Sequence, residues 1–402
     1  MKILVVCQYY YPESFKVTDV CESLAKLGHE VTVLTGLPNY PTGIVPGEYK
    51  SGEHNDEIIK GVHIIRCHEI GRKKGVVHLA LNYISFYLSA MKTIKKIKGD
   101  FDVVYSYQLS PIFMALPAKW YKKKHNIPMF LYCCDLWPES LKMYIKNEGN
   151  PAYKWVMGIS KKVYDSADMI ATQSESFISY LMDVHHIDKS KLTYIPNFAD
   201  EEYLSKDFFA DNNEIIDFVF LGNVGIAQNL TKVIDAFKLA CDKADMKLHI
   251  VGGGACVQDL KEQAERMSIS DKVLFYGQRP VEEMPVYYKL ADACIVSLKS
   301  DNATGLTLPA KVQGYMAAGK PIIGMITGSA NETIKDADCG ICVEAEDVNG
   351  LADAFIRFAL LSEEERLSFG ISGREYFIKH FRKDIHISRV NDELDKLTKG
   401  KL

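Results

Sequence analysis

Apolar runs alternate with helically spaced apolar residues along the first half of the chain. The run Ile3–Cys7 has the length of a buried strand. Val20, Leu24 and Leu27 then follow at helical spacing, and a glycine ends the segment. A strand, a helix and a second strand, HEVTVLTG, predict a parallel βαβ unit. Further strands are expected in the runs GVHIIRCHEI, DVVYSY, PMFLYCC, ADMIATQS and KLTYIPN.

The same alternation begins again at Ile215. Strand-like runs are separated there by segments with helical apolar spacing, such as LTKVIDAFKLACDK. Two such alternations predict an α/β protein with two doubly wound, Rossmann-like domains that face each other across a cleft. We expect one domain over residues 1–198, a second over 199–380 and a final helix over 381–402. The strand-like runs of this half include IIDFVFLG, KLHIVGGG, KVLFYGQRP and ACIVSL.

The stretch from Asp301 to Gly324 predicts a loop, a short helix, a tight turn and a buried strand. Pro309 suits the first helical turn, and Gly319 suits the end of the helix. Lys311 then lies in the first turn, where the helix dipole disfavours a cation. An anion held by the free backbone N–H groups would make a lysine favourable there. The alternative is an ordinary surface lysine on an αβ loop.

Composition places the chain among folded globular proteins. The chain has 402 residues, of which 47% are hydrophobic and 25% are charged, and this size favours two domains. We expect no signal peptide and no membrane span, because no apolar run reaches about 18 residues. The ten cysteines are scattered without a repeating spacing, which is typical of reduced thiols in the cytoplasm.

Positive charge is concentrated in one part of the first half. Residues 60–124 hold 13 Lys and Arg against 3 Asp and Glu. The basic groups between Arg72 and Lys124 flank the apolar and aromatic run VVHLALNYISFYLSAM. This pattern predicts contact with an anionic membrane surface or a polyanionic ligand. A solvated helical face is the alternative, and nucleic acid is disfavoured because no nucleic-acid-binding module accompanies the charge.

Three loops of the second half suit a phosphate-bearing ligand. Gly222–Asn229 and Gly252–Gly254 each follow a predicted strand, and Thr304–Lys311 precedes the short helix. Ligands of such sheets bind at the carboxyl ends of the strands. Any one of these loops alone would be a simple tight turn, but together they favour a diphosphate. The residues that we expect to bind this ligand are Gly222, Asn223, Gly225, Gly253, Arg279, Asn302, Thr304, Gly305, Leu306, Thr307 and Lys311.

Two acids of the first half are candidates for catalysis beside Lys311. Asp135 and Glu139 lie in CDLWPES, at the end of a predicted strand. A carboxylate pair there could orient a hydroxyl acceptor or act as a base. The alternative is a helix-capping box. No GxGxxG motif accompanies the first strand, which disfavours a nicotinamide cofactor.

Several motifs together resemble one enzyme family, the group 1 (family 4) nucleotide-sugar glycosyltransferases of the GT-B fold. The resemblance is strongest to the WbuB-like branch, which builds bacterial O-antigens and capsules. It implies a nucleoside-diphosphate sugar, UDP-linked, in the C-terminal domain and a polyprenyl-diphosphate-linked acceptor in the N-terminal domain. It also implies retention of anomeric configuration, no bound metal, and a last helix that crosses back to the N-terminal domain. The motifs are QYYYPES, LTGLPNYPTG, DLWPES, ADMIATQS, YIPNF, LGNVGIAQNL and LPAKVQGYMAAGKPIIG.

The chain departs from the family pattern at its expected site. Many relatives carry two acids eight residues apart, and the matching positions here are Leu306 and Gly314. A glycine within a helix costs about 1 kcal/mol relative to alanine, so we expect a ligand or backbone to approach Gly314 closely. Asn223 stands where relatives often have a basic residue, which assigns diphosphate neutralisation to Lys311 and Arg279. A non-catalytic sugar-nucleotide-binding subunit and a UDP-sugar 2-epimerase are the competing hypotheses.

Overall fold

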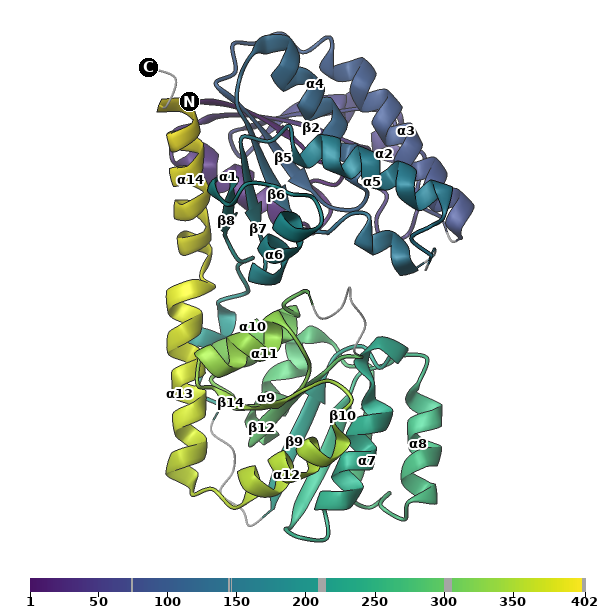
Figure 1. Cartoon of the computed structure of the whole chain (residues 1–402), viewed down its shortest axis with the longest axis vertical. Helices are drawn as coiled ribbons and strands as arrows, with labels where there is room; N and C mark the ends of the chain where they lie inside the picture. Colours follow the sequence, from purple (N-terminus) through teal and green to yellow (C-terminus); the bar gives the residue numbers. More distant parts are fainter. Residues whose placement is uncertain (74, 144, 146, 209–214, 300–305, 400–402) are drawn as a thin grey trace. The chain divides into compact units, whose positions relative to one another are not determined.

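The computed structural model describes residues 1–73, 75–143, 145, 147–208, 215–299 and 306–399 (Figure 1). It divides the chain into two compact units. Unit 1 comprises Met1–Ile195 and Ile387–Leu402, and unit 2 comprises Pro196–His386. The first division lies three residues before the boundary expected from the sequence, and the C-terminal segment of unit 1 begins six residues later than expected.

Unit 1 is built on one eight-stranded sheet, in the order β3-β4-β2-β1-β5-β6-β7-β8. Every neighbouring pair is parallel except β3 and β4. The edge strand β3 was not predicted, because its four residues alternate between half-buried and exposed and lack an apolar run. The strands are β1 (Lys2–Val6), β2 (Glu30–Thr35), β3 (Asp56–Ile59), β4 (Val62–Arg66), β5 (Val103–Gln108), β6 (Met129–Cys133), β7 (Met169–Thr172) and β8 (Leu192–Tyr194).

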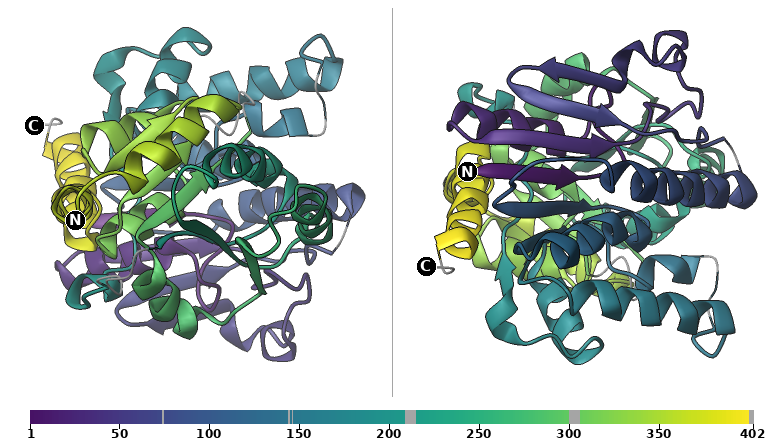
Figure 2. Two further views of the ribbon diagram at one scale, coloured as in Figure 1. Left: turned by 90° about the horizontal axis from the view of Figure 1, so that it is seen from below. Right: turned by 90° about the horizontal axis from the view of Figure 1, so that it is seen from above.

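Helices cover the sheet of unit 1, and the end of the last helix joins it. The N-terminus lies beside that helix (Figure 2), where the Met1 amino group contacts His29 Nδ1 at 3.3 Å and His29 Nε2 lies 2.6 Å from Asn391 Oδ1. The helices are α1 (Lys16–Lys26), α2 (Gly47–Lys50), α3 (Val76–Ile94), α4 (Leu116–His125), α5 (Pro151–Tyr164), α6 (Glu175–Asp183) and α14 (Lys383–Lys399), which begins in unit 2.

Unit 2 is built on a six-stranded, wholly parallel sheet in the order β11-β10-β9-β12-β13-β14. Its strands are β9 (Ile216–Leu221), β10 (Met246–Val251), β11 (Val273–Gly277), β12 (Ala293–Ser297), β13 (Ile322–Met325) and β14 (Gly340–Val343). Its helices are α7 (Leu230–Ala240), α8 (Val257–Arg266), α9 (Met284–Leu290), α10 (Ala310–Ala317), α11 (Ser329–Asp336), α12 (Val348–Ala359) and α13 (Glu363–His380).

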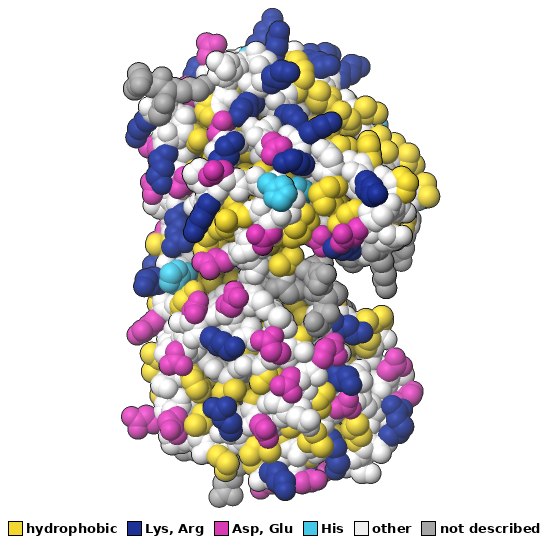
Figure 3. All heavy atoms as spheres, viewed as in Figure 1, with side chains coloured by type: hydrophobic (Ala, Val, Ile, Leu, Met, Phe, Trp, Pro, Cys, Tyr) yellow, Lys and Arg dark blue, Asp and Glu magenta, His cyan; other side chains and the backbone are white. Residues whose placement is uncertain are grey.

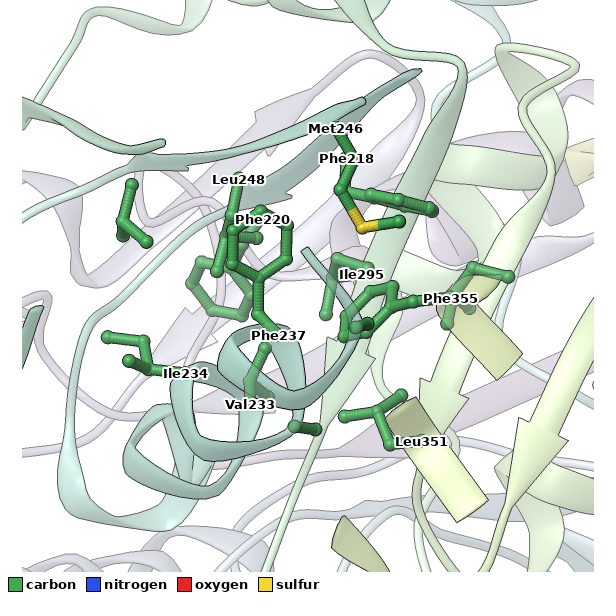
Figure 4. Close-up of a cluster of buried hydrophobic side chains, with 14 of the residues drawn as sticks. Phe218, Phe220, Val233, Ile234, Phe237, Met246, Leu248, Ile295, Leu351 and Phe355 are labelled. Carbon is green, nitrogen blue, oxygen red and sulfur yellow. The ribbon is translucent and has the colours of Figure 1, made fainter. Parts of the chain in front are cut away.

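Apolar side chains fill both faces of the unit 2 sheet. On one face, Phe218 of β9 packs against Phe355 of α12 with ring centroids 4.7 Å apart (Figure 4). On the other face, residues of β9 and β12 pack against α9, α10 and α13. Because both faces of the inner strands β9, β12 and β13 are buried, these strands read as largely apolar runs. Within the described residues, none of the helices combines the length and apolar character needed to cross a bilayer.

Candidate functional site

Loops at the carboxyl edge of the unit 2 sheet lie against one another. The loop after β9 hydrogen-bonds to the loop after β10, because Val224 N donates to Gly253 O at 2.8 Å. It also meets the chain after β12, where Lys299 N donates to Ala227 O at 2.9 Å. The structure therefore brings together two of the three loops that the sequence singled out, Gly222–Asn229 and Gly252–Gly254, and places the chain that leaves β12 beside the first of them.

The approach of these loops explains two of their glycines. A Cβ atom on Gly252 would lie 1.8 Å from the carbonyl oxygen of Gly222, a separation that no side chain allows. Both residues also have positive φ angles, +130° at Gly222 and +152° at Gly252, which side chains disfavour. Glycine is thus required for the backbones of β9 and β10 to meet at this edge.

Lys311 lies where the sequence predicts, in the first turn of α10 after Pro309. Its Nζ atom is buried and has no hydrogen-bond partner among the described residues. It lies 3.8 Å from the centre of the Phe220 ring, and a Cβ on Gly222 would be 3.3 Å from it. Burial lowers the pKa of Lys311 to about 7, because a charged ammonium loses its hydration there. A bound anion would stabilise the charged form at this helix N-terminus.

Tyr315 fixes α10 to the sheet. Its hydroxyl accepts a hydrogen bond from Leu221 N at 3.2 Å and donates to Ile295 O at 3.3 Å. The second half of α10 is thereby held against the end of β9 and the middle of β12. Neither Tyr315 nor Phe220 was singled out from the sequence, because each reads there as an ordinary core aromatic.

The remaining residues that were expected to bind the diphosphate lie in different loops of unit 2. Arg279 lies after β11, where its guanidinium pairs with Glu283 at 3.8 Å and donates to Tyr276 O at 3.1 Å. These contacts are to the end of β11 and to the turn that follows it, so the described partners of Arg279 are local. In the loop after β9, Asn223 Nδ2 and Gly225 N both donate to the side chain of Gln228.

Other candidates lie just before α10 or outside the described residues. Leu306 and Thr307 are half-buried in the turn that leads into α10. Gly253 faces Gln278, whose Cβ would lie 3.3 Å from an added Cβ. Asn302, Thr304 and Gly305 lie outside the described residues.

Of the two explanations expected for Gly314, a close approach of backbone is wrong, whereas a close approach of a ligand stays a prediction. The nearest atom to a Cβ added there would be the Tyr288 hydroxyl oxygen at 3.4 Å, which is an ordinary contact. The helix around this glycine has space for at least a methyl group, so backbone packing does not explain the residue.

The two acids of unit 1 have different surroundings. Asp135 is half-buried directly beyond β6, and burial raises the pKa of its carboxyl against hydrogen bonds from Ser110 that lower it. Glu139 is buried, and its Oε1 accepts hydrogen bonds from Tyr180 at 2.9 Å and Tyr153 at 3.2 Å. Its Oε2 pairs with Lys142 at 2.9 Å. Glu139 therefore joins α5 and α6 structurally, and Asp135 is the more available acid.

A buried polar cluster at the carboxyl ends of β1, β2 and β4 was missed by the sequence analysis. Glu69 Oε1 accepts hydrogen bonds from Gln8 at 2.7 Å, from Asn39 at 3.3 Å and from Asn82. Burial raises the pKa of Glu69 to about 8. The cluster fixes three loops with amide and carboxyl groups that are far apart in the sequence.

Metal-binding side chains do not gather in the described part of the chain: no group of three or more His, Cys, Asp or Glu there could hold a metal ion. Lys311 supplies a cationic group at the N-terminus of α10. The expectation that the protein needs no bound metal stays a prediction.

Comparison with known protein families identifies the chain. Residues 203–376 match the family of glycosyl transferases group 1, and residues 17–203 match glycosyltransferase family 4. The chain belongs to the group 1 glycosyltransferases of family 4. This confirms the family predicted from the sequence, whereas the finer likeness to the WbuB-like branch stays a prediction.

Named relatives of this family 4 glycosyltransferase include two bacterial proteins. It is 26% identical over 233 residues to N-acetyl-alpha-D-glucosaminyl L-malate synthase of Bacillus anthracis, a match over 56% of this chain and 58% of that protein. It is 24% identical over 391 residues to the putative colanic acid biosynthesis glycosyl transferase WcaI of Escherichia coli K12, covering 90% and 92% of the two chains. The match to the first of these thus spans less than two thirds of its length.

Among solved structures, Anabaena HepE in complex with UDP superimposes with a TM-score of 0.70 at 12% identity, over 98% of this chain and 100% of that one. At that identity the likeness shows the fold alone. Together with the family match and the two parallel sheets, it confirms the predicted GT-B class.

Proposed function

We propose that this family 4 glycosyltransferase moves a sugar from a UDP-sugar to a polyprenyl-diphosphate-linked saccharide. The reaction belongs to the synthesis of a bacterial surface polysaccharide, an O-antigen or capsule. The transfer retains the anomeric configuration. The transferred sugar is an N-acetylated amino sugar or a deoxy sugar. The observation that carries the donor side is the buried Nζ of Lys311 at the start of α10, which has no hydrogen-bond partner among the described residues.

The leaving group explains why such a lysine suits the reaction. Negative charge develops on the nucleoside diphosphate as the glycosidic bond breaks, and preorganised donors must stabilise it. The charged form of Lys311 and the free N–H groups of the first turn of α10 supply these donors without a metal ion. Asp135 orients the acceptor hydroxyl from the loop beyond β6.

Two comparisons support the chosen substrates. HepE was solved with UDP, which favours UDP as the nucleotide of the donor. WcaI is named for colanic acid biosynthesis, and the match to it runs over 90% of this chain, which favours a surface polysaccharide as the product.

Nucleotide binding tests the donor assignment. We would measure the shift in melting temperature with UDP, GDP and TDP, with and without magnesium. The expected result is stabilisation by UDP without metal, lost in Lys311→Ala. Lys335→Ala, which removes an exposed lysine from α11, is the matched control and should respond as wild type does. Equal stabilisation of Lys311→Ala by UDP would overturn the assignment.

A non-catalytic nucleotide-sugar-binding subunit is the second candidate, favoured by the absence of acids at Leu306 and Gly314. It shares the binding site and differs in turnover. Release of UDP from UDP-sugars in the presence of lipid-linked acceptors distinguishes the two. Binding without any release would favour the subunit.

We also propose that the protein works at the cytoplasmic face of the membrane through α3. Val77, Leu81, Ile84 and Leu88 recur at helical spacing and are 44% to 71% exposed. The opposite face of the helix, which includes Phe86, is buried against unit 1. Figure 3 shows hydrophobic side chains gathered over the part of unit 1 that carries α3, with Lys and Arg side chains near them.

Charge complementarity selects an anionic bilayer as the partner of this face. Helix α3 contains no Asp or Glu, and basic residues of the Arg72–Lys124 region flank it. An amphipathic helix of this composition binds the interface of anionic lipids. The double variant Ile84→Glu/Leu88→Glu should lose cosedimentation with phosphatidylglycerol vesicles. Leu239→Glu, at a residue of α7 that is 52% exposed, should not. Equal cosedimentation of both variants would contradict the proposal.

A further inference from the structure

Arg72 lies among loops that follow β1, β2 and β4. Its backbone N donates to Asn39 Oδ1 at 2.8 Å, which ties the chain before α3 to the loop after β2. Asn39 in turn donates to Glu69, and Tyr9 from the loop after β1 donates to Asn82 at 3.3 Å. Arg72 is therefore held at the carboxyl edge of the unit 1 sheet, where ligands of parallel sheets bind.

The guanidinium of Arg72 is surrounded by phenol rings. Its Cζ atom lies 5.9 Å from the centre of the Tyr40 ring and 6.0 Å from that of Tyr83. The Tyr9 hydroxyl forms a hydrogen bond with the Arg72 side chain. Burial acts to lower the pKa of Arg72, but Tyr83, Tyr9 and Tyr40 together raise this pKa above its ordinary value. We call Arg72, Tyr9, Tyr40 and Tyr83 the tyrosine box.

Within the described residues, no carboxylate forms an ion pair with Arg72, which is half-buried. The two acids of the neighbouring loops serve other groups. Glu13 Oε1 accepts the backbone N–H of Asn39 at 2.7 Å, and Glu69 Oε1 accepts side-chain amides. Glu69 also supplies little negative charge at neutral pH, because burial raises its pKa to about 8. The described part of the chain thus leaves the positive charge of Arg72 without a balancing carboxylate.

The tyrosine box is open to solvent on one side. Tyr40 is 47% exposed, and its ring packs against Phe15 with centroids 5.4 Å apart. An exposed, fixed ring offers an apolar surface to the C–H face of a sugar, while a planar guanidinium matches phosphate oxygens with paired hydrogen bonds. The two groups together fit a phosphate ester that carries a sugar.

We propose that the tyrosine box binds the diphosphate of the lipid-linked acceptor, with Arg72 as the phosphate-binding residue and Tyr40 as the surface for the adjoining sugar. This inference rests on the proposed function and extends it to the acceptor. Arg72 precedes the first exposed apolar residues of α3 by four and five positions, at Val76 and Val77. A diphosphate bound there has its prenyl chain beside the face that we assign to the bilayer.

Binding of farnesyl diphosphate, a short prenyl diphosphate, tests the site in the absence of membranes. Titration calorimetry on the full chain should show at least tenfold weaker binding by Arg72→Gln, and a smaller loss by Arg72→Lys. Lys73→Gln removes a neighbouring exposed charge and should change the affinity less than twofold. Inorganic diphosphate should compete with the probe. An equal loss in Arg72→Gln and Lys73→Gln would overturn the proposal.

Vesicles distinguish the acceptor diphosphate from an ordinary lipid headgroup. If Arg72 is a general membrane cation, Arg72→Gln and Lys73→Gln will weaken cosedimentation with phosphatidylglycerol vesicles equally, and farnesyl diphosphate binding will be unchanged in both. That result would overturn the proposal. The supporting result is a selective loss of farnesyl diphosphate binding in Arg72→Gln.

A second pair of variants covers the case in which Arg72→Gln lowers the melting temperature. Tyr40 is exposed, so Tyr40→Ala should fold and should bind the probe about threefold to tenfold more weakly, whereas Tyr40→Phe should bind as wild type does. Unchanged affinity in Tyr40→Ala would remove that ring from the site. Stabilisation by UDP is measured in parallel. If UDP does not stabilise the wild-type protein, the proposed donor is wrong. If Arg72→Gln binds farnesyl diphosphate as wild type does, only the assignment of the tyrosine box to the acceptor is wrong.

Discussion

The ammonium group of Lys311 lies 3.8 Å from the centre of the Phe220 ring, and no described residue accepts a hydrogen bond from it. The face of an aromatic ring attracts a cation, but it replaces only part of the hydration lost on burial. The surroundings of Lys311 are consequently short of negative charge. A bound diphosphate would favour the protonated form of Lys311, and the protonated lysine would donate a strong hydrogen bond to the diphosphate. Binding of the nucleotide and protonation of the lysine are therefore coupled.

This coupling predicts that UDP affinity falls as the pH rises through about 7, the pKa of Lys311 in the free protein. Above that pH the lysine is neutral and must take up a proton to bind the anion, so affinity should fall by up to about tenfold per pH unit. Calorimetry at pH 8 in buffers of different ionisation enthalpy should detect the proton uptake. Lys311→Met should bind UDP weakly at every pH and show no uptake; a pH dependence that persists in this variant would contradict the assignment.

Two glycines of unit 2 should respond oppositely to alanine. Gly252→Ala would place a Cβ 1.8 Å from Gly222 O and should destabilise the protein by about 1–3 kcal/mol through strain at the loop. Gly314→Ala meets only the Tyr288 hydroxyl at 3.4 Å and should stabilise α10 by about 0.5–1 kcal/mol. Denaturant unfolding measures both. A destabilised Gly314→Ala would mean that the helix is tighter around this residue than its contacts show.

Sequence patterns predicted the elements of both units well where burial is two-sided. The strands β1, β5, β9 and β12 read as continuous apolar runs because both of their faces are covered. Helix α10 was predicted from Pro309 and Gly319, whose backbone preferences are local. Strand β3 and helix α11 were among the elements that were missed, as were helices α5 and α6. Strand β3 is an edge strand of only four residues, and α11 has an eight-residue sequence, SANETIKD, that is mostly polar.

The candidate sites were predicted only in part, because their contacts join distant residues. Lys311 was found from its place in the helix, but Phe220 beneath it lies 91 positions earlier and has the sequence context of any core residue. Glu139 was a candidate catalytic acid because the local motif does not reveal its structural partners. These partners, Tyr153 and Tyr180, come from two later helices. The tyrosine box combines three separate loops and α3, so no local motif signals it.

Substitution of the two acids beyond β6 should have different effects: Glu139 should affect stability, and Asp135 should affect turnover. Glu139→Gln loses the ion pair with Lys142 while keeping its tyrosine contacts, and should cost about 1–3 kcal/mol of stability because the Glu139 carboxylate is buried. Asp135→Asn keeps the shape of the side chain and should lower turnover at least tenfold with little change in melting temperature. The measurements are chemical denaturation and steady-state transfer. The assignment of Asp135 to the acceptor is wrong if Asp135→Asn retains full turnover.

Glu69 should make the stability of the protein depend on pH in the sense opposite to a salt-bridged acid. Burial raises its pKa to about 8 in the folded state from the ordinary value of 4.5, so the folded chain holds a proton that the unfolded chain has lost between these two values. Because the folded state then binds more protons, its contribution to stability is full below pH 4.5 and is lost as the pH rises toward 8. Glu69→Gln keeps a neutral side chain of the same size and should remove this dependence.

The difference in unfolding free energy between Glu69→Gln and wild type should therefore shift in favour of the variant as the pH rises from about 5 to about 8. Urea unfolding at several pH values measures it. Glu22→Gln, at an acid of α1 that pairs with Lys60, controls for the general effect of losing a carboxylate. A difference that stays constant over this range would mean that Glu69 is already ionised in the folded protein, and the polar cluster would then hold a buried negative charge.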